Sequence, residues 1–243
     1  MNPIPHATWA AVYDRAYDEI YGRVLDSLTT KTIEVVADNV PERGRIVDFG
    51  AGTGRLAIPL ALKGYDVVAV EPCREMLEQL ALKQQGASGK ARAVCSTMQE
   101  FSDSGFDLAL CVFTVLAYLL DEDSLEQALR TAHSALKPDG CLFLDVAQQG
   151  IFGGFSRRGA TVRRDVTVTS QQNNIYLYRE RIGVHHGEFV GRVFDDEFKI
   201  RYWPPNRVRA ILEEIGFEIV RDFSQTSPFD VSGAHYWLMK KTG

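Results

Sequence analysis

The stretch Val47-Asp-Phe-Gly-Ala-Gly-Thr-Gly-Arg55 decides the fold of this chain. An apolar run carrying the acid Asp48 leads into three glycines spaced two residues apart, and the apolar segment 55–63 follows. Glycine adopts positive φ at little steric cost, so these glycines let the backbone turn sharply and lie against a ligand. The stretch therefore predicts a β-strand, a nucleotide-binding loop and a helix, in that order.

Further apolar segments predict a sheet around this first strand. They alternate with helical or polar sequence, which is typical of a doubly wound α/β fold. An amphipathic helix over 125–136 is expected to stop at Lys137-Pro-Asp-Gly140, and Pro205 to open a helix that Gly216 closes. We predict a Rossmann-like sheet of seven strands at Arg45–Phe49, Asp66–Glu71, Ala91–Cys95, Phe106–Phe113, Cys141–Asp145, Phe217–Phe223 and Ala234–Lys240.

Two additions to this sheet are expected within a single domain of residues 1–243. Residues 1–40 are predicted to form N-terminal helices, one over Thr8–Ser27 and a second capped by Thr29. Residues 150–203 are β-rich and predict an inserted antiparallel β-meander. Its strand candidates are Thr161–Ser170, Ile175–Val184 and Glu188–Trp203. We expect the helices and the meander to form a lid over the sheet.

Composition limits the classes of function. The 243 residues include 27 basic and 32 acidic side chains, a net charge of −5, so no overall positive field favours a nucleic acid. No apolar run is long enough to span a bilayer, and the first residues lack a secretory signal pattern. The four cysteines form no Cys-x-x-Cys pair, which disfavours zinc and disulfides. We predict a cytoplasmic protein with no metal and no nucleic-acid or membrane partner.

The spacing of the glycine loop bears on its ligand. A dinucleotide fingerprint places glycines at its first, third and sixth positions. Here the third glycine comes one residue early and Arg55 takes the sixth position, which disfavours a nicotinamide cofactor. Glu71 ends the second strand beside the loop, where a carboxylate accepts the hydroxyls of a ribose. An adenosine-containing ligand is therefore expected.

Several features occur together: strand-end acids, Gly-x-Gly-x-Gly, and Leu136-Lys-Pro-Asp-Gly140 before the fifth strand. In this combination residues 44–146 and the terminal helix and strand pair resemble the class I S-adenosylmethionine-dependent methyltransferases. The resemblance implies that Asp48 and the glycines hold the methionine part of S-adenosylmethionine, and Glu71 the ribose. The cofactor-binding residues that it implies are Asp48, Gly50, Ala51, Gly52, Thr53, Gly54, Glu71, Pro72, Cys73, Thr97, Met98 and Phe113.

The exit of the third strand departs from the family pattern. It reads Cys95-Ser-Thr-Met-Gln-Glu100, where similar proteins often place an Asp that binds the adenine amino group. Thr97 or Gln99 is the expected substitute, and Met98 is expected to pack on the purine ring. The aromatic N-terminal helix and the meander also resemble the small-molecule branch of the family, which includes amino-sugar N-methyltransferases.

A sulfonium methyl group is an activated electrophile, so alignment with the acceptor carries the rate, and a general base is optional. The residues expected on the substrate side are Tyr13, Tyr17, Tyr118, Asp145 and His185. Each has a structural alternative: packing for the tyrosines, helix capping for Asp145 and solvent exposure for His185. A second group is expected to form a solvated basic surface: Arg157, Arg158, Arg163 and Arg164.

These features predict methyl transfer from S-adenosylmethionine to a small-molecule acceptor by in-line displacement, at nitrogen or oxygen more readily than at carbon. The alternatives are a nicotinamide-dependent oxidoreductase and a noncatalytic S-adenosylmethionine-binding protein. Methylation of protein or RNA is disfavoured by the acidic charge and by the lack of a basic module. A homodimer is compatible with the sequence.

Overall fold

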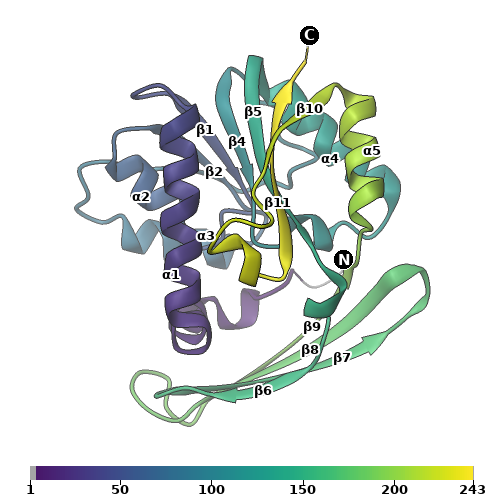
Figure 1. Cartoon of the computed structure of the whole chain (residues 1–243). Coiled ribbons are helices and arrows are strands. Elements are labelled where there is room, and N and C mark those ends of the chain that lie inside the picture. Colours follow the sequence, from purple (N-terminus) through teal and green to yellow (C-terminus); the bar gives the residue numbers. More distant parts are fainter. Residues whose placement is uncertain (1–3, 243) are drawn as a thin grey trace.

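The computed structural model describes residues 4–242, in which helices flank a seven-stranded sheet and a second sheet lies at one end (Figure 1). The large sheet has the order β10-β11-β5-β4-β1-β2-β3. Its strands are β1 (Arg45–Phe49), β2 (Asp66–Val70), β3 (Arg92–Val94), β4 (Phe106–Cys111), β5 (Leu136–Ala147), β10 (Phe217–Asp222) and β11 (Ala234–Lys241). The first five pair in parallel, and β11 runs antiparallel to both of its neighbours. The predicted Rossmann-like sheet is confirmed.

Helices cover both faces of this sheet because its strands alternate apolar side chains between two cores. Ile46 packs in the core beneath α1, α2 and α3, whereas Val47 packs in the core beneath α4 and α5. The helices are α1 (Tyr13–Asn39), α2 (Ala57–Leu62), α3 (Arg74–Lys83), α4 (Glu122–Ala135) and α5 (Pro205–Ile215). The short 3₁₀ helices are η1 (Ala7–Val12), η2 (Val115–Tyr118), η3 (Gln149–Ile151), η4 (Gln172–Asn174) and η5 (Phe229–Val231).

Two elements differ from the sequence prediction in where they begin. Helix α1 consists of two helical stretches that meet at a kink at Gly22 (φ 40°, ψ −119°), so the predicted second helix is present but follows Gly22 and is not capped by Thr29. The Thr29 hydroxyl donates to the Leu25 carbonyl oxygen at 2.8 Å, one turn earlier in the same helix. Strand β5 begins at Leu136, which pairs with Phe106, so the predicted turn before the fifth strand lies inside that strand.

The inserted meander is confirmed as a four-stranded antiparallel sheet, in the order β6-β7-β8-β9. Its strands are β6 (Phe155–Arg158), β7 (Val162–Ser170), β8 (Ile175–Val184) and β9 (Val193–Arg201). The sequence prediction missed β6, which is four residues long and carries two arginines. One apolar cluster joins this sheet to η1 and α1 around Trp9, and another joins it to η2 and the end of β5. The second sheet therefore lies across the carboxyl edge of the first (Figure 1).

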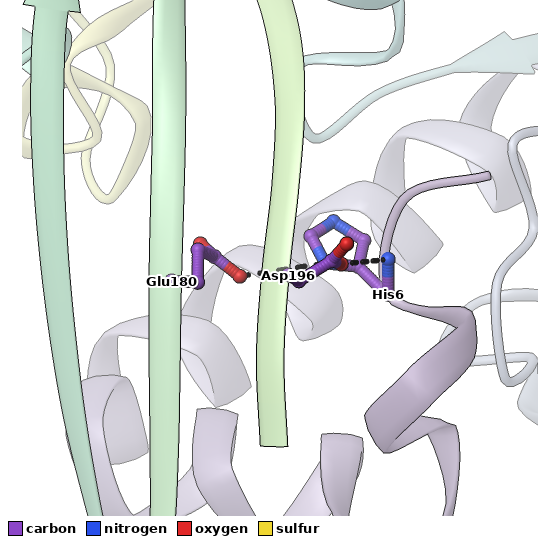
Figure 2. A group of neighbouring side chains, drawn as sticks. All are labelled: His6, Glu180 and Asp196. Carbon is purple, nitrogen blue, oxygen red and sulfur yellow. Dashed lines mark hydrogen bonds and ion pairs between the residues drawn. The ribbon is translucent and has the colours of Figure 1, made fainter. Parts of the chain in front are cut away.

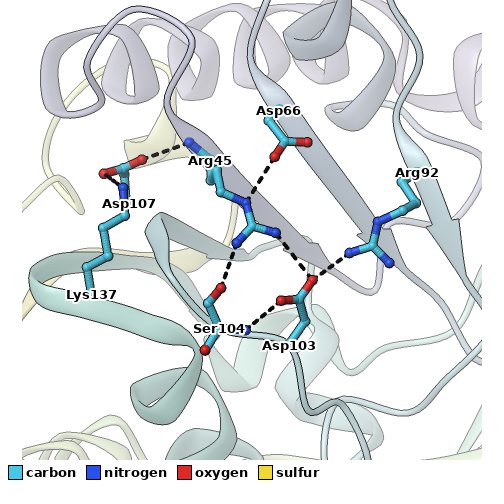
Figure 3. A network of polar contacts seen from close by, with 7 residues as sticks. All are labelled: Arg45, Asp66, Arg92, Asp103, Ser104, Asp107 and Lys137. Carbon is cyan, nitrogen blue, oxygen red and sulfur yellow. Dashed lines mark hydrogen bonds and ion pairs between the residues drawn. The ribbon is translucent and has the colours of Figure 1, made fainter.

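A network of charged side chains links the strands of the large sheet at their amino-terminal ends, opposite the glycine loop (Figure 3). Arg45 of β1 donates through Nε to Asp66 Oδ2 at 2.9 Å and through Nη1 to the Ser104 carbonyl at 2.6 Å. Its backbone N–H donates to Asp107 Oδ2 at 2.7 Å, and Lys137 holds the other oxygen of that carboxylate at 2.7 Å. The network thus links β1, β2, β4 and β5 at the end remote from the glycine loop. Within residues 4–242, no helix has both the length and the apolar character needed to cross a membrane.

We expect Arg45→Met to lower the free energy of unfolding by about 1 kcal/mol, because it removes charged hydrogen bonds of a half-exposed side chain. Chemical denaturation measures this change. Arg43→Met, two residues earlier in the exposed turn, is the matched control and should have no effect. Equal stability of the two variants would show that the network does not stabilise the sheet.

Candidate active site

A cavity of about 600 Å³ lies between the glycine loop and α1. This is the edge of an α/β sheet at which ligands bind, and the volume falls within the roughly 300–1,000 Å³ of small-molecule sites. The predicted cofactor-binding residues that line it are Asp48, Gly50, Ala51, Gly52, Thr53, Glu71, Pro72, Thr97, Met98 and Phe113. Gly54 and Cys73 lie outside the lining.

The three glycines have different structural roles. All have positive φ, of 70°, 56° and 88° for Gly50, Gly52 and Gly54. A Cβ on Gly50 would lie 2.5 Å from Val115 Cγ2, and one on Gly54 would lie 2.9 Å from Ile58 Cδ1. A Cβ on Gly52 would meet only the end of a methionine side chain, at 3.5 Å. Gly50 and Gly54 therefore permit close packing, while Gly52 presents bare backbone to the cavity.

The carboxylate of Glu71 is fixed by two backbone groups. Its Oε2 accepts the Gly52 N–H and its Oε1 accepts the Cys73 N–H, each at 3.0 Å. Burial raises the pKa of Glu71, against the effect of these two hydrogen bonds. A carboxylate oxygen has a further lone pair, so both oxygens can still accept a hydroxyl from the cavity. The geometry fits a ribose with two neighbouring hydroxyls.

Two buried acids, Asp48 and Asp145, lie at or near the cavity. Burial raises the pKa of Asp48 to about 7, although the positive charge of Arg55 opposes this shift. Asp145 is 1% exposed, and burial likewise raises its pKa to about 7. Asp48 lines the cavity, whereas Asp145 does not.

Asp145 instead supports a turn with unusual backbone geometry. Phe113 and Thr114, which follow β4, have φ values of 75° and 66°. Positive φ is costly for such residues and persists where the surroundings enforce it. The Thr114 N–H donates to both carboxylate oxygens of Asp145 at 3.0 Å. Asp145 thereby positions Phe113 and Thr114, both of which line the cavity.

Side-chain hydrogen bonds hold helix α1 over the glycine loop, and the sequence analysis did not predict them. The Thr53 hydroxyl donates to Asp14 Oδ1 at 2.5 Å, and Lys83 of α3 donates to Asp14 Oδ2 at 2.6 Å. Arg55 donates to the Thr29 hydroxyl at 2.8 Å. Asp14, Thr29 and Lys83 lie outside the glycine motif and far from it in sequence, so only the fold reveals their contacts.

The substrate-side candidates are only partly brought together. Tyr13, Tyr17 and Tyr118 line the cavity, and the rings of the first two lie 4.3 Å apart. His185 lies in the connection after β8, half-exposed and outside the lining. The prediction of a solvated basic surface is wrong for Arg164, which is 4% exposed and donates to Glu180 Oε1 at 2.5 Å. The side chains of Arg157, Arg158 and Arg163 are exposed, as expected.

Comparison with known proteins identifies the family. A family model described as a methyltransferase domain matches residues 46–140. A protein of Geobacillus sp. (strain WCH70) that is named as a methyltransferase is 34% identical to this chain, over 81% of this chain and 84% of its own length. The chain belongs to the class I S-adenosylmethionine-dependent methyltransferases. The YqeM protein of Bacillus subtilis (strain 168) is also named as a methyltransferase. It is 29% identical to this chain, over 93% of this chain and 94% of its own length.

Solved structures show that the whole methyltransferase shares one fold with other members. An S-adenosylmethionine-dependent methyltransferase of Clostridium acetobutylicum ATCC 824 superposes with a TM-score of 0.83 at 20% identity, covering 96% and 99% of the two chains. The amino pentose methyltransferase CalS10 of Micromonospora echinaspora, solved with S-adenosylmethionine bound, gives 0.76 at 22% identity, covering 95% and 97%. S-adenosylmethionine is the cofactor of this methyltransferase, and the nicotinamide alternative is not supported.

Two relatives have names that state their acceptors. A glycine/sarcosine N-methyltransferase of Aphanothece halophytica is 30% identical over 81% of this chain and 76% of its own length. A tRNA 5-carboxymethoxyuridine methyltransferase of Escherichia coli (strain K12) is 29% identical over 74% of each chain. The family therefore includes both small-molecule and RNA acceptors.

We expect Glu71→Ala to weaken S-adenosylhomocysteine binding by about 1–3 kcal/mol, because charged hydrogen bonds to the ribose are lost. Calorimetric titration measures the affinity, and Glu78→Ala on the exposed face of α3 is the control. Unchanged affinity in Glu71→Ala would remove this carboxylate from the cofactor site.

The raised pKa of Asp145 predicts a pH-dependent stability. Because the folded pKa of about 7 lies above the ordinary value of 3.8, the stabilising contribution is complete below about pH 4 and is lost as pH rises through 7. We expect Asp145→Asn to remove a decline on the order of 1–3 kcal/mol between pH 4 and 8. Urea denaturation of the cofactor-free protein at both pH values measures it. A decline as steep as that of Asp38→Asn, an exposed control, contradicts the prediction.

Proposed function

We propose that this methyltransferase methylates a nitrogen or oxygen atom of a small molecule by in-line displacement. The observation that supports the proposal is the make-up of the cavity: Asp14 holds α1 over the glycine loop, and Tyr13, Tyr17 and Tyr118 line the same space of about 600 Å³. A site of this size suits a small acceptor. We treat residues 1–243 as one domain of a cytoplasmic enzyme, monomeric or homodimeric, with the N-terminal helices and residues 150–203 as its lid.

Each residue set has a task in this proposal. When bound, S-adenosylmethionine supplies a methyl group on a positively charged sulfur. Asp48 and the glycine loop hold the amino-acid part, and Glu71 holds the ribose. Thr97 and Met98 border the adenine, while Phe113, set by Asp145, closes the wall beside the donor group. Orientation by these groups makes the displacement effectively unimolecular.

The charge of the cavity favours an amine. Asp14, Asp18 and Asp26 of α1 all contribute to the lining, and of the three, within the part of the chain that the structure describes, only Asp14 forms an ion pair, with Lys83. Burial, followed by the charges of Asp14 and Asp26, raises the pKa of Asp18. Acidic groups and tyrosine faces both attract a cationic amino group. The glycine/sarcosine and amino pentose methyltransferases among the similar proteins support the same acceptor class.

An acceptor panel tests the proposal. Purified protein and S-adenosylmethionine are incubated separately with glycine, sarcosine, free amino sugars, nucleotide-linked amino sugars, the corresponding hydroxyl compounds, and bulk tRNA. S-adenosylhomocysteine is quantified by mass spectrometry. We expect turnover with a small amine or hydroxyl compound and none with tRNA. Turnover with tRNA alone would overturn the proposal in favour of RNA methylation, which the tRNA methyltransferase relative makes the relevant rival.

We expect Asp18→Asn to raise KM for an amine acceptor roughly two- to fivefold, as loss of one partly exposed charge interaction predicts. Affinity for S-adenosylhomocysteine should not change. Asp38→Asn on the exposed face of α1 is the matched control for the steady-state kinetics. An unchanged KM for the amine would remove Asp18 from acceptor recognition.

A further inference from the structure

A buried polar cluster joins the N-terminal segment to the second sheet (Figure 2). His6, just before η1, lies beside Glu180 of β8 and Asp196 of β9. Its Nδ1 is 3.6 Å from Glu180 Oε2 and 4.0 Å from Asp196 Oδ2. The three residues are 8%, 3% and 8% exposed, respectively. Buried charges of this kind require compensation by partners.

The backbone of His6 fixes the position of its ring. His6 has a φ of 67°, and its backbone N–H donates to Asp196 Oδ2 at 2.6 Å. With the backbone held in this way, the two ring nitrogens face different groups. Nδ1 faces Glu180, and Nε2 lies 2.9 Å from the hydroxyl of Tyr118.

The charges in this cluster are unequal in number. Arg164 of β7 donates to Glu180 Oε1 at 2.5 Å, and Asp196 adds a second carboxylate beside His6, so one guanidinium accompanies two acidic groups. Within residues 4–242, neither His6 Nδ1 nor Glu180 Oε2 has a hydrogen-bond partner. Burial opposes ionisation of Glu180, but the nearby His6 ring and the Arg164 guanidinium hold its pKa below its ordinary value. A positive charge that formed on the His6 ring during turnover would therefore lie beside the negative charge of Glu180.

Tyr118 connects this cluster to the cavity. It lines the same cavity as Glu71 and Phe113, and 37% of its surface is exposed. Burial around the hydroxyl, together with the charges of Tyr17 and Glu180, raises the pKa of Tyr118 well above its ordinary value. The hydroxyl therefore keeps its proton unless a base such as His6 accepts it.

We propose that Tyr118, His6 and Glu180 form a proton relay that takes up the proton of the acceptor. The relay rests on the proposed small-molecule function, because it requires an acceptor with an N–H or O–H bond. The acceptor lone pair bonds to the methyl carbon, and the carbon–sulfur electron pair returns to sulfur. The acceptor proton passes to Tyr118 Oη as the Tyr118 proton passes to His6 Nε2. Glu180 stabilises the resulting imidazolium.

Other groups also surround His6 and bear on its protonation. The titratable residues that lie against it are Tyr13 of α1, Tyr118 of η2, Glu180 of β8 and Asp196 of β9. Arg164 and Tyr17 belong to the next layer, through Glu180 and Arg164 respectively, and Glu71 feels the charge of His6. Among residues 4–242, Glu180 combines an unpartnered oxygen with a position facing Nδ1, so removing its carboxylate should change the position of the His6 proton.

A bound divalent metal is the rival use of these side chains. His6, Glu180 and Asp196 offer ligand atoms that all lie within 4.8 Å of one another. The cation Arg164 already contacts Glu180, and the His6 backbone already engages Asp196 Oδ2. Both contacts disfavour a second cation at this position.

The histidine tautomer tests the relay without any acceptor. We would record ¹⁵N NMR spectra of histidine-labelled protein saturated with S-adenosylhomocysteine, assigning His6 with His6→Gln. We expect the neutral ring to carry its proton on Nδ1 and to leave Nε2 as the hydrogen-bond acceptor. Glu180→Gln should reduce the share of the neutral His6 ring that carries its proton on Nδ1. The opposite tautomer, or an unchanged tautomer balance in Glu180→Gln, would overturn the relay.

Kinetics and metal binding complete the test. With an acceptor identified from the panel, Tyr118→Phe and His6→Gln should each slow methyl transfer about 100-fold at neutral pH, with the deficit shrinking as pH rises. S-adenosylhomocysteine affinity should stay unchanged, and His186→Gln, an exposed histidine, should be as active as wild type. Variant rates equal to wild type at every pH would overturn the relay while leaving the small-molecule function intact. Stoichiometric Zn²⁺ or Mn²⁺ uptake that Glu180→Gln abolishes would overturn it in favour of a metal site.

Discussion

The site depends first on the Glu71 carboxylate held between the N–H groups of Gly52 and Cys73. This arrangement joins the loop after β1 to the loop after β2, so the glycine turn and the acid occupy one rigid frame. Gly50 and Gly54 make the frame possible, because a side chain at either position would collide with Val115 or Ile58. Gly52 leaves its backbone open to the cavity beside the Glu71 carboxylate, and we propose that the ligand binds against these two groups.

The two additions to the sheet cover part of its open edge. The contacts of Asp14 with Thr53 and Lys83 draw α1 over the glycine loop. The β6–β9 sheet packs beneath η1 and η2, which brings the His6 segment and Tyr118 together at the far side of the cavity. In the function that we propose, the common fold of the family supplies the cofactor half, and the lid elements supply the chemistry of the acceptor half.

Sequence patterns predicted the parts of this molecule that depend on local chemistry. The glycine loop, the seven-stranded sheet and the meander follow from backbone freedom and from periodic apolar residues, and the structure confirms them. Asp14, His6 and the buried Arg164–Glu180 pair escaped prediction, because their roles arise from contacts between residues more than ten positions apart. Arg164 illustrates the difficulty. Its neighbour Arg163 is exposed, and a strand alternates its faces, so composition alone could not assign the buried side.

A crystal structure of the protein with S-adenosylhomocysteine tests the central claim most directly. We expect both ribose hydroxyls to donate to the Glu71 carboxylate, the amino-acid part to lie along Gly50–Gly52, and the sulfur to face Tyr13 and Tyr118. A ligand whose ribose makes no contact with Glu71, or whose sulfur faces away from these tyrosines, would contradict the assignment of the two halves of the cavity.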